Sequence, residues 1–196
     1  MDTVNTTRPS LLVRIKDLRD EMAWGEFAQL YTPLIYRFAR QSGLQDADAS
    51  LVTQDVLVTV ARTIHRFEYN RKTGSFRGWL KVVTRSRLTD FLRAQGREVQ
   101  GTGDTAMLHV MDEQLDASQP DLWEREFRRT LFEWAVDRIR CDFEDTTWQA
   151  FWQTSVGDRE TADVAEELGL SVGAVYIARS RVLARLRQEV LDVEER

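Results

Sequence analysis

The strongest constraint on the fold lies in residues 161–187, which read as a short helix, a glycine turn and a second helix. Gly169 follows the first helix at the position where a left-handed backbone favours glycine. Ser171 is then placed to cap the second helix. Apolar residues recur at helical spacing along both helices: Val164, Ala165, Leu168, Val175, Ala178 and Val182. This order of elements is typical of a helix-turn-helix that reads DNA.

The second of these helices and its extension are dense in arginine: Arg179, Arg181, Arg185 and Arg187. Arginines at this spacing repel each other unless an anion partner is present, and DNA phosphate is such a partner. The alternative is a solvated amphipathic helix with an apolar seam. We favour the DNA interpretation because the small residue, the glycine, the cap and the seam occur together in the right order.

The formal net charge of −5 argues against nucleic acid only as an average, because the charges are segregated along the chain. Residues 81–97 hold five basic side chains and one acid, Asp90. Residues 98–126 hold eight acids and one base, Arg125. The helix at the C-terminal end is basic again. Two basic segments are therefore separated by an acidic one.

Hydrophobic periodicity predicts an all-α protein, because strand signals are nearly absent and glycine and proline are few. Four helices are expected in the first half of the chain, at about residues 10–20, 23–41, 46–66 and 75–95. The expected buried face of the third helix comprises Leu51, Val52, Val56, Val60 and Ile64. Core positions in the second half are expected at Trp123, Trp134, Trp148 and Trp152.

Between residues 96 and 120 the periodicity is lost, and Gly101, Gly103 and Pro120 punctuate acidic and polar sequence. Such a composition is typical of a linker. We therefore predict two small helical domains, at 10–95 and 121–196, joined by an acidic flexible linker over 96–120.

Residues 74–93 interleave aromatic and basic side chains. Basic side chains neutralise phosphates, and exposed aromatic rings stack on unpaired bases. The segment is therefore a candidate platform for an opened DNA strand. Phe76 and Trp79 stand at helical spacing and are better explained as core, whereas Tyr69 lies in the preceding polar loop.

Other classes of site find little support in the sequence. Cys141 is the single cysteine, and His65 and His109 are far apart, so no metal-ligand spacing is present. Neither a phosphate-binding glycine loop nor a nucleophile elbow occurs. We expect no catalytic residue, no metal and no cofactor. No apolar run approaches the roughly 18 residues of a membrane span, and no signal-peptide core precedes the first helix, so a cytoplasmic protein without membrane insertion is expected.

Both blocks, in this order, resemble a bacterial RNA polymerase sigma factor of the extracytoplasmic-function (ECF) group in the sigma-70 family. The first block resembles region 2 through VTQDVL at 52–57 and GSFRGWL at 74–80. The second resembles region 4 through TADVAEELGLS at 161–171 and VLARLR at 182–187. The resemblance extends from about residue 24 to residue 190. It implies a region 2-like bundle and a region 4-like helix-turn-helix domain.

The resemblance also implies roles for individual residues. Core-polymerase binding would involve Asp48, Ser50, Leu51, Gln54 and Asp55. The −10 promoter element would be contacted by Tyr69, Asn70, Arg71, Lys72, Lys81, Arg85, Asp90 and Arg93. The −35 element would be contacted by Ser171, Val172, Gly173, Tyr176, Ile177, Arg179, Ser180 and Arg181. The last set holds few of the side chains that usually read base edges, which favours shape readout and contacts with thymine methyls.

One departure from the family pattern falls at Ser50 and Leu51, where members usually carry a pair of acidic residues. In one interpretation, the neighbouring Asp46, Asp48 and Asp55 suffice for polymerase binding. In the other, phosphorylation of Ser50 or Thr53 restores about −1.5 to −2 charges near a helix N-terminus and switches polymerase binding on.

The resemblance predicts a sigma factor that directs RNA polymerase to specific promoters, recognises the −35 element and melts the −10 element, without catalytic activity. Its expected partners are core RNA polymerase and promoter DNA, with an anti-sigma factor or a Ser/Thr kinase as further candidates, and the free protein is expected to be a monomer. The alternative is a stand-alone helix-turn-helix regulator whose N-terminal block senses a signal or dimerises. A helical nuclease is disfavoured because the sequence has no compact acidic motif.

Overall fold

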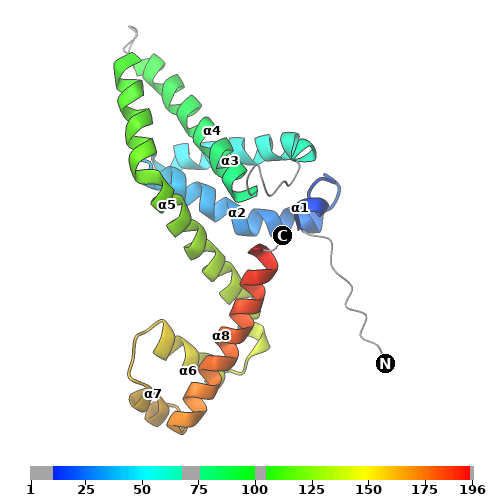
Figure 1. Ribbon diagram of the computed structural model, residues 1–196, viewed down its shortest axis with the longest axis vertical. Helices are drawn as coiled ribbons and strands as arrows, with labels where there is room; N and C mark the ends of the chain where they lie inside the picture. Colours follow the sequence, from blue (N-terminus) through cyan, green and yellow to red (C-terminus); the bar gives the residue numbers. More distant parts are fainter. Residues whose placement is uncertain (1–10, 68–75, 100–104, 195–196) are drawn as a thin grey trace. The chain divides into compact units, whose positions relative to one another are not determined.

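The computed structural model describes residues 11–67, 76–99 and 105–194, and these form an all-α protein without a strand (Figure 1). This confirms the predicted fold class. The α-helices are α1 (Leu11–Arg14), α2 (Glu21–Gln41), α3 (Asp46–Thr63), α4 (Phe76–Val99), α5 (Thr105–Ile139), α6 (Asp145–Ser155), α7 (Thr161–Glu167) and α8 (Val172–Glu194). None of the described helices combines the length and apolar character that a bilayer span requires.

The chain divides into two compact units, with the boundary between Thr130 and Leu131. In the first unit, α3 packs against both α2 and α4. Their apolar stripes meet in a core made of Phe27, Leu30, Leu34, Ile35, Phe38, Val52, Val56, Val60, Leu80 and Leu88. The part of α5 in this unit joins the core through Trp123, whose ring meets the Phe38 ring edge-on at 5.1 Å. Burial of these side chains is the main stabilising contribution to this unit.

Two charged residues set the start of α2. The Asp20 carboxylate accepts a hydrogen bond from the Ala23 backbone N–H at 2.9 Å, which satisfies one of the orphan donors of the first turn. The same carboxylate receives two hydrogen bonds from Arg14, each 2.9 Å long. The Arg14 guanidinium holds the pKa of Asp20 below its ordinary value. The first helix ends at Arg14, earlier than the expected residue 20.

An aromatic cluster anchors the start of α4 to α2. Phe76 lies edge-on to Phe27 and Tyr31, at 6.0 and 5.5 Å between ring centroids. Trp79 packs on Phe67 and Phe76. Burial raises the pKa of the Tyr31 phenol to about 12, because the charged form would lose its hydration. Phe76 and Trp79 are therefore engaged in packing, as the helical spacing predicted.

The second unit contains the end of α5 together with α6, α7 and α8, and its core holds the predicted helix-turn-helix. α8 packs against α6 and α7. Gly169 adopts a left-handed backbone with φ of 64°, and Ser171 Oγ accepts a hydrogen bond from the Ala174 backbone N–H at 3.1 Å. The predicted apolar seam is buried at Val164, Ala165, Val175, Ala178 and Val182. The local prediction is therefore confirmed in its turn, its cap and its seam.

The predicted linker differs from the structure. Residues 105–120 lie within α5 and residues 96–99 lie within α4, so this segment is not irregular where it is described. Residues 105–119 contain neither glycine nor proline, and nine of them are alanine, leucine, methionine, glutamate or glutamine. These residues favour a helix without any apolar stripe. The boundary between the compact units falls inside α5, after the predicted linker.

Two predicted core positions are exposed. Leu51 is 55% exposed, because the buried face of α3 runs through Ala49, Val52, Val56 and Val60, and Leu51 stands beside it. Trp152 is 38% exposed, whereas Trp148, one helical turn earlier, is buried. Apolar character marked these residues as core, and the rotation of each helix decided otherwise.

Candidate functional site

Most of the predicted polymerase-binding residues share one side of α3. Leu51, Gln54, Asp55 and Val58 stand three or four residues apart, so they lie on one helix face. All four are exposed, and we call them the α3 surface. Asp48 is held at its edge, because its carboxylate accepts a hydrogen bond from the Gln95 side chain of α4 at 3.1 Å. The result is a surface on which the apolar side chains Leu51 and Val58 flank the Gln54 amide and the Asp55 carboxylate.

A groove of about 620 Å³ opens beside the α3 surface, between α2 and α3. Its walls are mostly apolar and include Pro33, Leu57 and Gln54. At one end the Tyr36 hydroxyl donates a hydrogen bond to the Asp46 carboxylate. This hydrogen bond raises the pKa of Tyr36.

The two proposed phosphorylation sites differ in access. The Ser50 hydroxyl is half-buried at the groove and donates a hydrogen bond to the Asp46 carbonyl at 2.9 Å. Thr53 is only 4% exposed, and its hydroxyl donates to the Ala49 carbonyl at 2.7 Å. A phosphate on Thr53 would place a dianion inside the core, which is strongly unfavourable. This burial argues against Thr53, and Ser50 alone is retained.

The predicted −10 residues fall into three groups. Tyr69, Asn70, Arg71 and Lys72 lie outside the described residues. Lys81 and Arg85 share one face of α4, where they are half-buried. Asp90 and Arg93 are exposed, but successive residues of a helix are rotated by about 100°, which places this pair on a different side of α4. The structure therefore does not bring these four residues to a single face.

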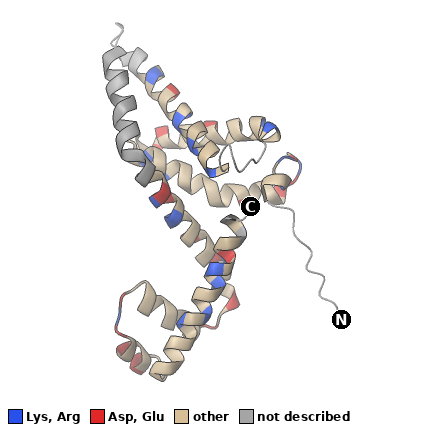
Figure 2. Ribbon diagram, in the orientation of Figure 1, with Lys and Arg blue, Asp and Glu red and all other residues tan. Residues whose placement is uncertain are grey.

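Arg87 is not among the predicted −10 residues, but it links one of them, Asp90, to the α3 surface. Its guanidinium lies 3.8 Å from the Asp55 carboxylate of α3 and 3.6 Å from Asp90 of α4. Figure 2 shows the basic residues along α4 with an acidic residue among them. Because Asp90 pairs with Arg87, it neutralises part of the positive charge expected of this helix.

The −35 residues stand at the N-terminal end of α8 and in the turn before it. Ser171, Gly173, Ser180 and Arg181 are exposed, and Arg179 is half-buried. The larger apolar side chains there are also exposed, Val172 to 43%, Tyr176 to 55% and Ile177 to 61%. Because these side chains point away from the core, they are available to a partner.

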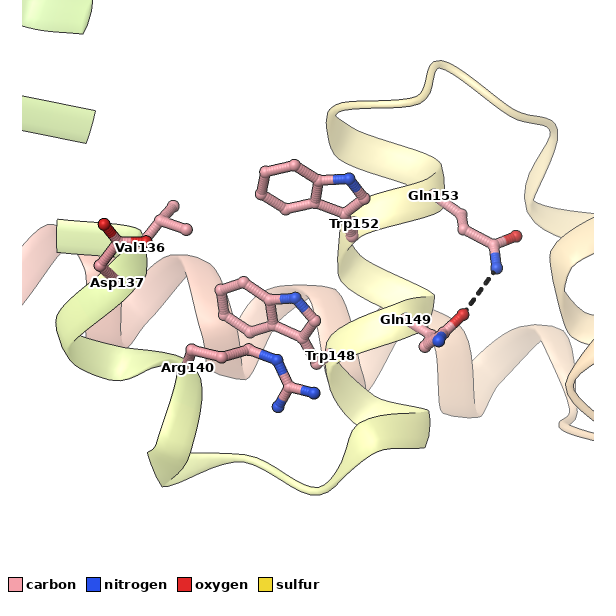
Figure 3. A pocket seen from close by; sticks show the side chains of 7 residues that line it. All are labelled: Val136, Asp137, Arg140, Trp148, Gln149, Trp152 and Gln153. Atoms are coloured by element: carbon pink, nitrogen blue, oxygen red, sulfur yellow. Dashed lines mark hydrogen bonds between the residues drawn. The ribbon is translucent and has the colours of Figure 1, made fainter. Parts of the chain in front are cut away.

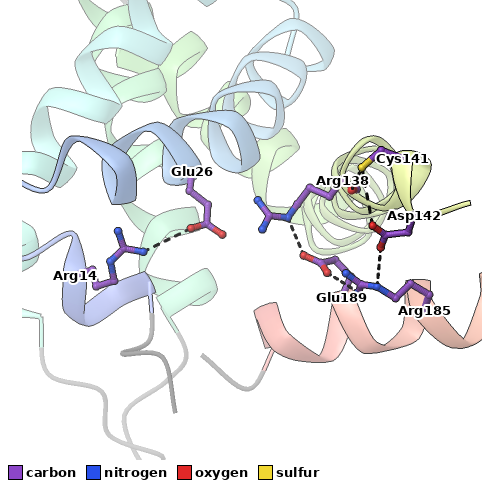
Figure 4. Close-up of polar contacts among 7 residues, drawn as sticks. All are labelled: Arg14, Glu26, Arg138, Cys141, Asp142, Arg185 and Glu189. Carbon is purple, nitrogen blue, oxygen red and sulfur yellow. Dashed lines mark hydrogen bonds and ion pairs between the residues drawn. The ribbon is translucent and has the colours of Figure 1, made fainter. Parts of the chain in front are cut away.

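Arg185 does not need DNA as its anion partner. Its guanidinium pairs with Asp142 at 3.0 Å and with Glu189 at 2.7 Å. Glu189 also accepts a hydrogen bond from Arg138 of α5 at 2.8 Å (Figure 4). Burial by itself would raise the pKa of Glu189, but the hydrogen bonds from the two arginines outweigh it and lower the pKa. Sequence reasoning missed this network, although the i, i+4 spacing of Arg185 and Glu189 was a usable signal.

A second groove, of about 370 Å³, lies between the end of α5 and α6 (Figure 3). Trp148 and Trp152 stack along it with ring centroids 5.9 Å apart. The Arg140 guanidinium lies over the Trp148 ring at 5.2 Å. Within the described residues, no group of three or more His, Cys, Asp or Glu side chains could hold a metal ion.

Comparison with known proteins places this geometry in a family. Residues 27–98 match the family described as Sigma-70 region 2. This range contains α3 and most of α2 and α4. The ECF RNA polymerase sigma factor RpoE of Cereibacter sphaeroides is 28% identical over 92% of this chain and 93% of its own length. The ECF RNA polymerase sigma factor SigE of Mycolicibacterium smegmatis is 28% identical over 38% of this chain and 28% of its own length.

The helical bundle, the helix-turn-helix and these matches support a protein of the sigma-70 class. Within that class, they support an extracytoplasmic-function RNA polymerase sigma factor. The similarity to RpoE extends over both compact units, so it includes the helix-turn-helix as well as the region 2 bundle.

Proposed function

We propose that this protein directs RNA polymerase to specific promoters at transcription initiation. The observation that carries the proposal is the combination, in one chain, of a region 2 bundle and an exposed helix-turn-helix, over which the similarity to an ECF sigma factor is continuous. Core RNA polymerase and promoter DNA are the partners. The protein acts in the cytoplasm as a monomer when free, and it contributes no catalytic chemistry of its own.

The two compact units bind different parts of the polymerase–promoter complex. The α3 surface binds core polymerase, because exposed apolar side chains around a carboxylate suit a protein partner. The basic residues of α4 and the loop before it hold the −10 element, since Lys81 and Arg85 present positive charge to phosphate. The N-terminal turns of α8 enter the major groove of the −35 element, as the second helix of a helix-turn-helix does.

In vitro transcription with core polymerase on a library of promoters tests the function directly. We expect transcripts only when the protein and core polymerase are both present, and the active templates should share two elements. The free protein should bind promoter DNA weakly and with strong salt dependence, because its overall charge is negative. Tight sequence-specific binding without polymerase, or a dimer that needs paired half-sites, would instead indicate a stand-alone regulator.

Substitution of Leu51 tests the polymerase-binding surface separately. Leu51→Lys places a cation beside Asp55 on the α3 surface and should weaken binding to core polymerase at least tenfold in a DNA-free assay. Met22→Lys is the matched control, because Met22 is an apolar side chain of the same unit that is 82% exposed and belongs to α2. Equal loss of binding in both variants would show that the effect is not specific to the α3 surface.

Phosphorylation of Ser50 is the proposed control of this surface, with a Ser/Thr kinase as the partner, and an anti-sigma factor is the other candidate regulator. A phosphate on Ser50 would add about −1.5 to −2 charges at the groove beside Gln54. We expect Ser50→Asp to bind core polymerase more tightly than the unmodified protein and than Ser50→Ala. Equal affinity of all three proteins would overturn the phosphorylation proposal and leave the sigma-factor function intact.

A further inference from the structure

The side of α8 opposite its buried seam is unusual for a helix that reads DNA. Successive helical residues are rotated by about 100°. The seam at Val175, Ala178 and Val182 therefore places Gly173, Ile177, Ser180 and Ala184 on the outward side, with Tyr176 next to them. Over residues 173–184 this outward side, which we call the reading face, is made of apolar and small residues and carries no charge.

Direct readout of bases normally depends on arginine, lysine, asparagine or glutamine, whose side chains form paired hydrogen bonds with base edges. Residues 171–178 contain none of these. The Ser171 hydroxyl is already engaged, since it accepts a hydrogen bond from Ala174. What the reading face offers to a groove is mainly hydrocarbon, with Ile177 61% and Tyr176 55% exposed.

Arginines stand on the two flanks of the reading face. Arg179 and Arg181 are two residues apart, so a rotation of about 100° per residue places them on nearly opposite sides of the helix axis. Neither has an ion-pair partner in the part of the chain that the structure describes, whereas Arg185 is held by Asp142 and Glu189. A cation on each side of an apolar centre matches a DNA groove, in which phosphates line both walls and bases form the floor.

Gly173 allows the floor of a DNA groove to approach the helix closely. A Cβ atom built on this residue would have only Ser171 Oγ nearby, at 3.9 Å, so the space in front of the helix is open. The apolar group that DNA presents in its major groove is the C5-methyl of thymine. A protein partner would match the hydrocarbon of the reading face but not the flanking cations.

We propose that α8 reads its promoter element through thymine methyl groups, which Ile177 and Tyr176 contact while Arg179 and Arg181 hold the flanking phosphates. This proposal rests on the proposed function, since it takes α8 to be the helix in the −35 element. It predicts that the upstream element contains thymines, on either strand, at the positions under the reading face.

Replacement of thymine by deoxyuridine tests the proposal, because it removes the methyl group and leaves every hydrogen-bonding atom in place. In a promoter obtained from the library, each thymine of the upstream element is replaced singly, and binding of the protein–polymerase complex is measured. We expect at least one position to lose about fourfold in affinity, the effect of exposing one methyl-sized group. Ile177→Ala should weaken binding to normal DNA and remove the sensitivity to deoxyuridine at its own position.

Leu191→Ala is the matched control, because Leu191 is an apolar residue of the same helix, 40% exposed, about 21 Å along the axis from Ile177. It should leave both the affinity and the deoxyuridine sensitivity unchanged. Polymerase-dependent transcription from an element that lacks thymine, or that tolerates deoxyuridine at every position, would overturn the methyl readout while the proposed function stands. Absence of polymerase-dependent transcription would overturn the proposed function and the readout with it.

Discussion

Glu189 provides the most quantitative test of how α8 is held in place. It lies on α8, is 7% exposed, and accepts hydrogen bonds from Arg138 of α5 at 2.8 Å and from Arg185 at 2.7 Å. Glu189→Gln preserves the shape of the side chain but removes its charge. It also turns one acceptor into a donor that faces an arginine.

The expected loss follows from these two contacts. A hydrogen bond to a charged group contributes about 1.5–3 kcal/mol when it is buried. The side chains of Arg138 and Arg185 are 41% and 39% exposed, so water replaces part of each contact. We therefore expect Glu189→Gln to lower the free energy of unfolding of the second unit by about 1–2 kcal/mol. With an m-value of about 1 kcal/mol/M for a small domain, the urea midpoint should fall by about 1–2 M.

The effect should also depend on pH in a defined direction. The pKa of Glu189 is lowered in the folded protein, so the unfolded chain takes up a proton first as the pH falls. The stabilising contribution is complete above the unfolded pKa of about 4.3 and is lost as the pH falls through the folded value. The difference between the wild-type protein and Glu189→Gln should therefore be constant near neutrality and shrink below about pH 4.

Urea titration followed by circular dichroism measures the loss, and hydrogen exchange of residues 172–194 assigns it to α8. Glu166→Gln is the control, because Glu166 is an exposed acid on α7 in the same unit. The reasoning would be refuted by an unchanged midpoint for Glu189→Gln at pH 7, by an equal loss in the control, or by a difference that does not shrink in acid.

Three further predictions follow from single residues. Gly169→Ala should lower the free energy of unfolding by about 1–2 kcal/mol in a urea titration, because φ of 64° strains a residue with a side chain. Gly25→Ala, in the open interior of α2, should instead raise it by about 0.5–1 kcal/mol. Equal effects of the two substitutions would contradict the backbone argument. Trp148→Ala should cost about 3–5 kcal/mol, as for a buried aromatic core residue, and the exposed Trp152→Ala less than half of that in the same assay. In an alkaline absorbance titration, Tyr31→Phe should remove the phenol that ionises near pH 12, and loss of a phenol that titrates near pH 10 instead would contradict the burial of Tyr31.

The helix-turn-helix was predictable in detail because its determinants are close in sequence. Gly169, Ser171 and the seam that includes Val175 act within about two helical turns of one another, so spacing alone encodes their geometry. The Glu189 network was not predictable in the same way, since Arg138 reaches it from a different helix. From the sequence alone, Glu189 had no assigned partner, and DNA phosphate was the expected anion partner of Arg185.

The sequence by itself determined the helical class, the helix-turn-helix and the family resemblance, because helical periodicity, capping and turn chemistry are local properties of the chain. Only the tertiary structure decided which apolar residues are covered. It exposed Leu51 and Trp152, buried Thr53, and neutralised Arg185 with carboxylates. These outcomes depend on the rotation of each helix against its neighbours, and the packing of whole helices sets that rotation.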